Sequence, residues 1–399
     1  MSDAAPLAGL TVLDLGHTIM GPCAGLILAD LGGDVIKIEP PEGDPTRRLP
    51  GFGAGFFATF NRNKRSLSLD LKRPEGRAAL HRLAARADIL LENFGPGTME
   101  RLGCGWEVLT ALNPRLIYLA LKGYLAGPSE GRGALDEVVQ MQTGLATMTG
   151  PPGRPLRAGA SVIDIMGAVF GVVGALAALR ERDRTGRGQR VGSALFESAA
   201  FLVGTHIAGS ALTGGPIPPM PARRSPWGIY DLFESADDAL IFVGVTSDAH
   251  WRRFAPAFDL VDLLDDNRLT GNAARAAERA WLIPRLAERM RALPAADIVA
   301  RCEAAGVPHA RVAHPFDLLQ EPHLLAGGGL LPTALATAGG GGGERAGLPA
   351  LPLEFGEERT RAGLHRQPPA VGEQSDEILR QAGFSAAETS ALRAAGALG

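Results

Sequence analysis

The start of the chain constrains the fold most, because two short apolar runs flank one helix-like segment. Residues 10–14 form an apolar run that ends in an acid, and residues 34–38 form a second run. Between them, residues 21–32 predict a helix that stops at a Gly-Gly pair. The order strand, helix, strand is typical of a βαβ unit, so we expect the first domain to be α/β with parallel strands.

The same alternation continues through the first half of the chain. Further strands are expected at residues 65–70, 89–93 and 116–121, and a helix is expected to begin at Pro74. Residues 162–182 predict a long apolar helix, and the apolar segment 192–212 predicts another. We therefore assign residues 1–213 to one large α/β domain.

The second half begins with a Gly- and Pro-rich stretch at residues 214–226, which is typical of a linker. A strand at residues 240–245 and mostly helical residues 273–304 predict a smaller α/β domain over residues 214–330. Residues 339–343 are all Gly and predict a mobile connection. A short helix is expected near residues 377–383, within a C-terminal segment that covers residues 331–399.

Composition excludes several classes of function. The 399 residues carry a formal net charge of −3 and no dominant basic block, so no nucleic-acid partner is expected. The three cysteines match no zinc pattern, so we expect no metal site and a reduced, cytoplasmic protein. The apolar residues 163–179 favour a buried core helix over a membrane span. No G-x-G-x-x-G or Walker sequence follows a predicted strand, which argues against dehydrogenase and P-loop functions.

An ordered series of motifs resembles the family III CoA-transferases, which include formyl-CoA transferase and the α-methylacyl-CoA racemases. The most specific motif is Glu-Asn-Phe-Gly-Pro-Gly at residues 92–97, followed by Arg-Leu-Gly at residues 101–103. Other matching segments are residues 6–14, 21–25, 31–39, 61–65, 69–72, 113–118, 186–189, 306–308 and 372–376. Gln374 stands where the family usually has His.

The resemblance implies a fold and an assembly that periodicity cannot show. The family fold has a large Rossmann-like domain, a smaller α/β domain and a C-terminal return to the first. Its members are interlocked homodimers in which each subunit threads the other. The expected substrates are an acyl-CoA thioester and a small carboxylic acid, with no permanently bound cofactor.

Asp164 matches the catalytic aspartate of the family, which precedes a long apolar helix. A helix N-cap is the alternative interpretation, since Asp is common at that position. A carboxylate that attacks a thioester forms a mixed anhydride and then an aspartyl-CoA thioester, so every intermediate stays activated. Backbone N–H groups at the helix start are expected to hold the oxyanion.

The resemblance also implies a set of residues along the CoA groove. Thr18 and Ile19 match the loop near the thioester, although the transferase often has Gln at the second position. Asn93 and Phe94 match a backbone contact to the pantetheine arm, and Arg101 matches a phosphate contact. The full set of expected CoA-binding residues is Thr18, Ile19, Lys37, Leu71, Lys72, Asn93, Phe94, Arg101 and Asp136. Each charged member also fits a surface or strand-end role.

Two alternatives to CoA transfer remain at this point: a 2-methylacyl-CoA racemase and a non-catalytic CoA-binding protein. A racemase needs a second base, and the matching position is Leu135 rather than His; the nearest histidines in sequence are His81 and His206. Asp136 could in principle substitute, but a second carboxylate near Asp164 would raise a pKa by like-charge repulsion rather than provide a matched pair of bases.

The segment 136–159 resembles transferases that act on small dicarboxylates such as mesaconate or succinate. In that case Arg157 or Arg47 is expected to pair with the distal carboxylate of the acid. A surface role is the alternative for each arginine.

Overall fold

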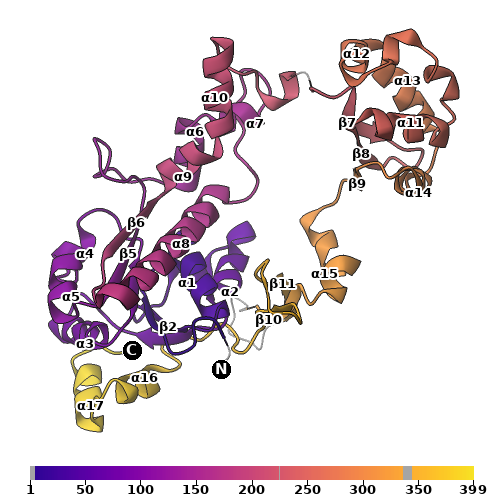
Figure 1. The fold of residues 1–399 in the computed structure, drawn as a ribbon. Coiled ribbons are helices and arrows are strands. Elements are labelled where there is room, and N and C mark those ends of the chain that lie inside the picture. Colours follow the sequence, from indigo (N-terminus) through magenta and orange to yellow (C-terminus); the bar gives the residue numbers. More distant parts are fainter. Residues whose placement is uncertain (1–4, 224, 336–343) are drawn as a thin grey trace. The chain divides into compact units, whose positions relative to one another are not determined.

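The computed structural model describes residues 5–223, 225–335 and 344–399, and these residues form two compact units (Figure 1). The first unit combines the chain up to Pro221 with Pro322–Gly399, and the second unit is Ala222–Glu321. The partition expected from sequence, with breaks after residues 213 and 330, stays a prediction. The Gly run at residues 339–343 lies outside the described residues.

The first unit is built on a six-stranded sheet with the order β3-β2-β1-β4-β5-β6. All five strand pairings are parallel. The strands are β1 (Thr11–Asp14), β2 (Asp34–Glu39), β3 (Arg65–Ser68), β4 (Ile89–Glu92), β5 (Ile117–Lys122) and β6 (Arg190–Ala194). The expected parallel α/β architecture is confirmed, and the strand order is that of a doubly wound sheet.

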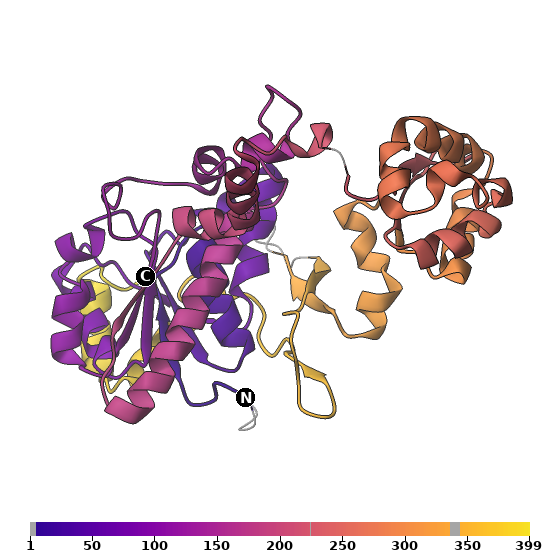
Figure 2. The ribbon, with the colours of Figure 1, turned by 45° about the horizontal axis from the view of Figure 1, so that its top comes forward.

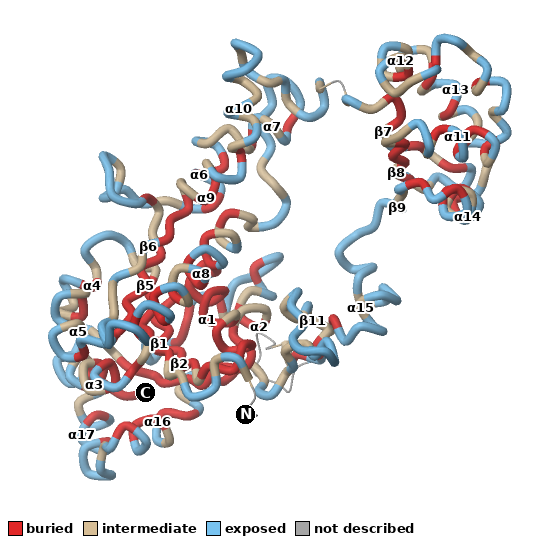
Figure 3. The backbone as a smooth tube through the Cα atoms, viewed as in Figure 1, coloured by how far each residue is buried: buried red, intermediate tan, exposed pale blue. Residues whose placement is uncertain are grey.

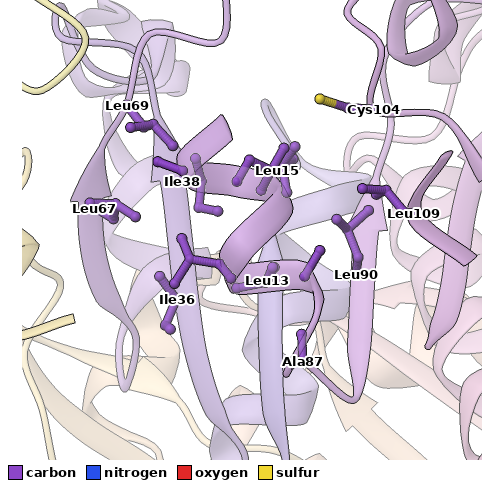
Figure 4. Close-up of a cluster of buried hydrophobic side chains, with 14 of the residues drawn as sticks. Leu13, Leu15, Ile36, Ile38, Leu67, Leu69, Ala87, Leu90, Cys104 and Leu109 are labelled. Carbon is purple, nitrogen blue, oxygen red and sulfur yellow. The ribbon is translucent and has the colours of Figure 1, made fainter. Parts of the chain in front are cut away.

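The central strands are buried on both faces, as a parallel sheet covered by helices requires (Figure 3). Successive residues of one strand enter opposite cores: Val12 faces one cluster and Leu13 the other, and the same is true of Val35 and Ile36. Figure 4 shows the second of these clusters, in which Leu13 packs with side chains from neighbouring strands and helices.

Helices cover the two faces of the sheet in two groups. One face packs against α1 (Met20–Asp30), α8 (Val162–Thr185) and α9 (Leu195–Leu202). The other face packs against α3 (Pro74–Ala84), α5 (Trp106–Leu112), α16 (Ser375–Gln381) and α17 (Ala386–Ala394). Figure 2 shows the yellow C-terminal helices on the same side of the sheet as the purple helices α3 and α5. The C-terminal segment thus completes the core of the first unit, and a bridge from Leu398 to Leu69 fixes it there.

The apolar helix α8 buries only one side. Its small residues, among them Gly167, Gly171 and Ala175, lie against the sheet, whereas Val169 and Val173 on its opposite side are exposed. The helix is long and apolar enough to cross a membrane, but 44% of its most apolar window is buried inside the protein. The next apolar segment differs from expectation, because residues 190–194 form the edge strand β6 before α9 begins. Five residues of parallel edge strand carry too little periodicity to be separated from a following apolar helix.

Shorter elements complete the first unit. They are α2 (Phe56–Asn61), α4 (Thr98–Arg101), α6 (Asp136–Gln142), α7 (Leu145–Thr149), α10 (Gly204–Thr213), α15 (Pro322–Ala326), β10 (Leu330–Ala334), β11 (Arg345–Pro349), β12 (Glu354–Phe355) and β13 (Thr360–Arg361). Strands β10 and β11 pair as an antiparallel hairpin, as do β12 and β13.

The second unit is a small α/β fold with an antiparallel sheet of order β7-β8-β9. Its strands are β7 (Ile229–Glu234), β8 (Leu240–Val245) and β9 (His309–Arg311), and its helices are α11 (Asp248–Ala257), α12 (Asn272–Ala277), α13 (Arg279–Arg291) and α14 (Ala295–Ala305). Its core contains Phe233, Val243, Phe254, Leu286 and Ile298.

Candidate active site

The candidate site lies where the strand order of the parallel sheet reverses. From β1 the chain continues to β2 on one side, and from β4 it continues to β5 on the other side. The connections that follow these two neighbouring strands therefore run in opposite directions from the carboxyl edge of the sheet. A cleft of about 210 Å³ opens at this point. Its lining includes residues from the loops after β1, β4 and β5, together with Leu135, Asp136 and Asp164.

The loops after β1 and β4 are joined to each other. The side-chain amide of Asn93 accepts a hydrogen bond from the backbone N–H of His17 at 2.8 Å and donates one to its carbonyl at 3.0 Å. Thr18 follows in a left-handed conformation with φ 65°, which is costly for a β-branched residue and marks a constrained loop. A Cβ atom at Gly16 would lie 2.6 Å from the Cα atom of Gly21, so the loop needs glycine there.

Buried ion pairs lie beneath the loop after β1 and support it. The Lys64 ammonium donates to Asp14 at 2.7 Å, and both side chains are fully buried. Lys37 donates to the carbonyl of Gly16 at 2.7 Å and to Asp44 at 2.9 Å. Lys37 was expected to contact CoA, but its ammonium points into the protein, where it holds the loop after β1 in place.

Asp164 is the third residue of α8 and lines the cleft. Ser161 occupies the N-cap, and its side chain makes no capping bond. The carboxylate of Asp164 therefore does not cap its own helix, and within the described residues it makes no hydrogen bond or ion pair. The N-cap interpretation of Asp164 is wrong, and its carboxylate is free to react.

Asp136, from the start of α6, supplies the cap instead. One of its carboxylate oxygens accepts from the backbone N–H groups of Ile163 at 2.8 Å and Asp164 at 3.0 Å. The N–H groups of Val162 and Ile165 bond to the carbonyls of Ala160 and Ser161. The expectation that the start of this helix holds an oxyanion is therefore wrong, because its N–H groups are already used. Asp136 is itself buried.

The surroundings of Asp164 make its carboxylate unusually basic. Burial, followed by the negative charges of Asp136 and Glu137, raises the pKa of Asp164 from 3.8 to about 7. The like-charge effect expected of Asp136 is thereby confirmed. A carboxylate with a raised pKa is a stronger nucleophile than an ordinary surface carboxylate, and perturbed pKa values are typical of functional groups in clefts.

The structure brings together six of the ten residues assigned to the site from sequence. The members that line the cleft are Thr18, Ile19, Asn93, Phe94, Asp136 and Asp164. Leu71 is half-buried after β3, and Lys72 beside it is exposed. Arg101 is exposed on α4 and donates to the Thr98 hydroxyl at 2.8 Å. These three follow strands of the same parallel sheet, so they lie at the same carboxyl edge as the cleft.

Four charged or titratable residues that line the cleft were not expected from sequence: His17, Lys122, Glu130 and Arg132. Burial lowers the pKa of His17, whose ring lies 5.6 Å from that of Phe94. Lys122 is paired with Glu92 at 2.6 Å. His17 and Lys122 sit at the carboxyl ends of β1 and β5, and that position was the signal that could have identified them. Among the residues that the structure describes, the cleft is therefore lined by His17, which is far from Leu135 in sequence. It is not lined by His81 or His206, the two histidines nearest to Leu135 in sequence.

The two arginines expected to bind a distal carboxylate differ in their surroundings. Arg47 forms a two-bond pair with Glu39, donates to the carbonyl of Pro369 and lies over the ring of Phe57. Its guanidinium is thus occupied within the protein. Arg157 is half-buried and pairs with Glu137 at 3.1 Å.

Comparisons with known proteins agree with this geometry. The model of CoA-transferase family III matches residues 7–375. A succinyl-CoA–D-citramalate CoA-transferase from Chloroflexus aurantiacus is 36% identical over 335 residues, which cover 80% of this chain and 82% of that protein. A succinyl-CoA:mesaconate CoA-transferase from Haloarcula hispanica is 35% identical over 333 residues, covering 80% and 83%.

A solved structure supports the same assignment. A CAIB/BAIF family protein from Brucella suis superposes with a TM-score of 0.82 at 30% identity, covering 95% of this chain and 99% of that one. The likeness extends over nearly the full length of both chains. The chain therefore belongs to the family III CoA-transferases and is an enzyme that transfers CoA from a thioester to a carboxylic acid.

Proposed function

We propose that this enzyme moves CoA between a thioester and a small dicarboxylic acid, and that Asp164 carries the acyl group. One observation supports this most strongly. Asp164 lines the cleft at the switch point of the sheet with no hydrogen bond or ion pair from the described residues, and its pKa is raised to about 7. A carboxylate with these surroundings is available as a nucleophile at neutral pH.

The reaction begins when the Asp164 carboxylate attacks the thioester carbonyl carbon. A C–O bond forms, the C–S bond breaks, and the products are a mixed anhydride and the CoA thiolate. The thiolate then attacks the Asp164 carbonyl carbon of the anhydride, releasing the first acid and leaving an aspartyl-CoA thioester. The incoming carboxylate attacks this thioester to give a second anhydride, and the thiolate returns to the new acyl group, which frees Asp164.

The CoA chain is proposed to follow the carboxyl edge of the sheet. Thr18, Ile19 and Phe94 line the cleft beside Asp164, and the side chain of Asn93 is used to join the two loops. Only the backbone of Asn93 is then left for the pantetheine arm. The exposed Lys72 and Arg101 at the same edge are proposed to bind phosphates through charge-assisted hydrogen bonds.

A dicarboxylic acid is the proposed substrate because both relatives described above are named for succinyl-CoA and a dicarboxylic acid. Arg132 lines the cleft, and the described residues give it no ion pair. It is therefore our first candidate to bind the distal carboxylate, and Arg157, which is paired with Glu137, is the second.

Arg132→Ala tests this assignment. The kcat/KM for succinate should fall about tenfold to a hundredfold, the value of one hydrogen-bonded charge pair, while butyrate should be little affected. Arg154→Ala removes an exposed arginine that does not line the cleft and serves as the control. An equal effect of Arg132→Ala on succinate and butyrate would exclude its role in binding the distal group.

We also propose that the enzyme is an interlocked homodimer. The outer side of α8 carries exposed Ile165, Val169 and Val173, Phe201 on α9 is 72% exposed, and α10 has no buried residue. Apolar helices exposed over this length favour a second copy as the covering partner. A cytoplasmic location is proposed as well, because the three cysteines are free and buried, as in a reducing compartment.

A racemase is the second candidate, since His17 and Asp164 line the same cleft. Such an enzyme removes a proton from one face of the α-carbon and returns one to the other. The position that matches the family's second base is held by Leu135, so we expect no exchange. Incubation with a 2-methylacyl-CoA in deuterated water tests this, and deuterium at the α-carbon at a rate comparable to CoA transfer would favour the racemase.

The role of Asp164 is tested by comparing Asp164→Ala with Ser161→Ala. Both change the start of α8, but the Ser161 side chain makes no capping bond. Transfer from succinyl-CoA to mesaconate should disappear in the folded Asp164→Ala variant and persist in Ser161→Ala. Substantial transfer by folded Asp164→Ala would overturn the proposal.

A further inference from the structure

A short hydrogen-bond chain connects Asp164 to the segment that precedes its helix. Gln140 is fully buried on α6, and its side-chain oxygen accepts from the backbone N–H of Ala158 at 2.9 Å. Its amide nitrogen donates to one oxygen of Asp136 at 2.5 Å, and the other oxygen of Asp136 accepts from the backbone of Ile163 and Asp164. The chain thus joins α6 to the residues on both sides of the start of α8.

The orientation of each member is forced by the next. Since the backbone N–H of Ala158 can only donate, Gln140 must present its oxygen there and its NH₂ group to Asp136. Asp136 must then accept on both oxygens, which the ionised carboxylate does best. Three donors converge on Asp136, so the structure stabilises its negative charge.

This arrangement changes the electrostatics at the start of α8. An acid in the first turn of a helix is ordinarily stabilised by the free N–H groups and the positive end of the dipole. Here Asp136 takes the N–H groups nearest Asp164 and places a second negative charge beside it. The stabilisation that would weaken Asp164 as a nucleophile is thereby cancelled.

We propose that Asp136 is a positioning residue which fixes the first turn of α8 and keeps Asp164 strongly nucleophilic, and that Gln140 orients Asp136 for this role. The inference rests on the proposed function of Asp164. It replaces the expected contact between Asp136 and CoA with an indirect role.

Other charged groups also face Asp164. Glu137 on α6 adds negative charge and is itself paired with Arg157. The charge of Asp164 in turn contributes to raising the pKa of the Cys23 thiol on α1. The remaining titratable or charged residues that line the cleft are His17, Lys122, Glu130 and Arg132. Among all of these, Asp136 has the largest charge effect on the pKa of Asp164.

Two variants separate the charge of Asp136 from its hydrogen bonds. In Asp136→Asn, the new oxygen can still accept from α8, but the new NH₂ group faces the NH₂ group of Gln140. When Asp136→Asn is combined with Gln140→Glu, the new carboxylate accepts from both the new NH₂ group and the backbone N–H of Ala158. The double variant therefore restores the hydrogen-bond chain but moves the negative charge one hydrogen bond away from Asp164.

The readouts are the melting temperature and the pH dependence of kcat/KM for transfer from succinyl-CoA to mesaconate. Asp136→Asn should lower the melting temperature, and the double variant should recover it. In both variants the acidic limb of the pH profile, where kcat/KM rises with pH, should move to lower pH. The reason is that removing the neighbouring charge lowers the pKa of Asp164. The shift should be about one pH unit in the single variant. Above about pH 8 both should be slower than the wild type, since a less basic carboxylate is a weaker nucleophile.

Glu137→Gln is the matched control, because Glu137 is an exposed acid on the same helix that makes no bond to α8. It should move the limb less than Asp136→Asn and leave the melting temperature unchanged. If the double variant recovers stability and its limb coincides with that of the wild type, Asp136 has only a structural role and the inference is overturned. Asp164→Ala is assayed in parallel, and transfer by that variant would refute the proposed function itself. If Asp164→Ala is inactive but the acidic limbs of Asp136→Asn and of the double variant coincide with that of the wild type, only the inference about Asp136 is refuted.

Discussion

Replacing the proposed nucleophile should make the protein more stable at alkaline pH. Asp164 is half-buried near two other carboxylates, and these surroundings raise its pKa from 3.8 to about 7. Asp164→Asn keeps the shape of the side chain but removes the charge. We therefore expect the variant to unfold at higher urea concentration than the wild type at about pH 8.

The sign follows from proton binding in the two states. Between about pH 4 and 7 the unfolded chain has released the Asp164 proton and the folded protein retains it, so stability falls as the pH rises through this window. The full difference corresponds to about 4 kcal/mol at about 1.36 kcal/mol per pH unit. Because Asp164 is partly open to the cleft and solvent screens its charge, we expect about 1–2 kcal/mol at about pH 8 and less at about pH 5.5.

The assay is urea unfolding followed by circular dichroism at one protein concentration, at about pH 5.5 and about pH 8, on either side of the raised pKa. The gap in stability between Asp164→Asn and the wild type should widen as the pH rises. Asp183→Asn, which removes an exposed acid from the same helix, controls for the change in net charge and should show no such widening. A gap that is absent or narrower at the higher pH would refute the electrostatic description of the site.

Three further predictions concern the buried ion pair of Lys64 and Asp14, the loop after β1 and the oligomeric state. Lys64→Met leaves Asp14 buried and unpaired, so it should cost about 3–5 kcal/mol in urea unfolding, and adding Asp14→Asn should recover much of this; an unchanged stability would contradict the buried pair. Gly16→Ala should lower both the melting temperature and the affinity for succinyl-CoA because its Cβ would collide with backbone, whereas Gly55→Ala, at an exposed glycine outside the cleft with nothing within 4 Å, should do neither. Phe201→Glu should shift the proposed homodimer toward monomer in sedimentation experiments, and a variant with the same oligomeric state as the wild type would contradict an interface at this helix.

The fold was largely predictable from sequence because its strands carry strong local signals. Short apolar runs bounded by Gly or acidic residues marked β1, β2, β4 and β5 to within one or two residues. The edge strand β6 was missed because it is short and runs directly into an apolar helix. The exposed side of α8 was also hidden, since a helix that is apolar on all sides gives no amphipathic pattern.

The parts of the site that lie in motifs at strand ends were predictable from sequence. The roles of residues that depend on contacts between distant parts of the chain were not. Asp164 and the loops after β1 and β4 lie on one cleft as expected. The role of Asp136 depends on contacts between residues 28 positions apart, which no local pattern reveals. Lys37 shows the opposite case: a strand-end lysine resembles a phosphate ligand until the fold places Asp44 and the Gly16 carbonyl around its ammonium.

In the proposed reaction, Asp164 becomes covalently linked to CoA during turnover. Mass spectrometry of the enzyme quenched and digested after incubation with succinyl-CoA, without an acceptor acid, tests this most directly. We expect a CoA thioester on the peptide that contains Asp164, its loss when mesaconate is added, and its absence from Asp164→Ala. Rapid transfer with no adduct, or an adduct on a different residue, would contradict it.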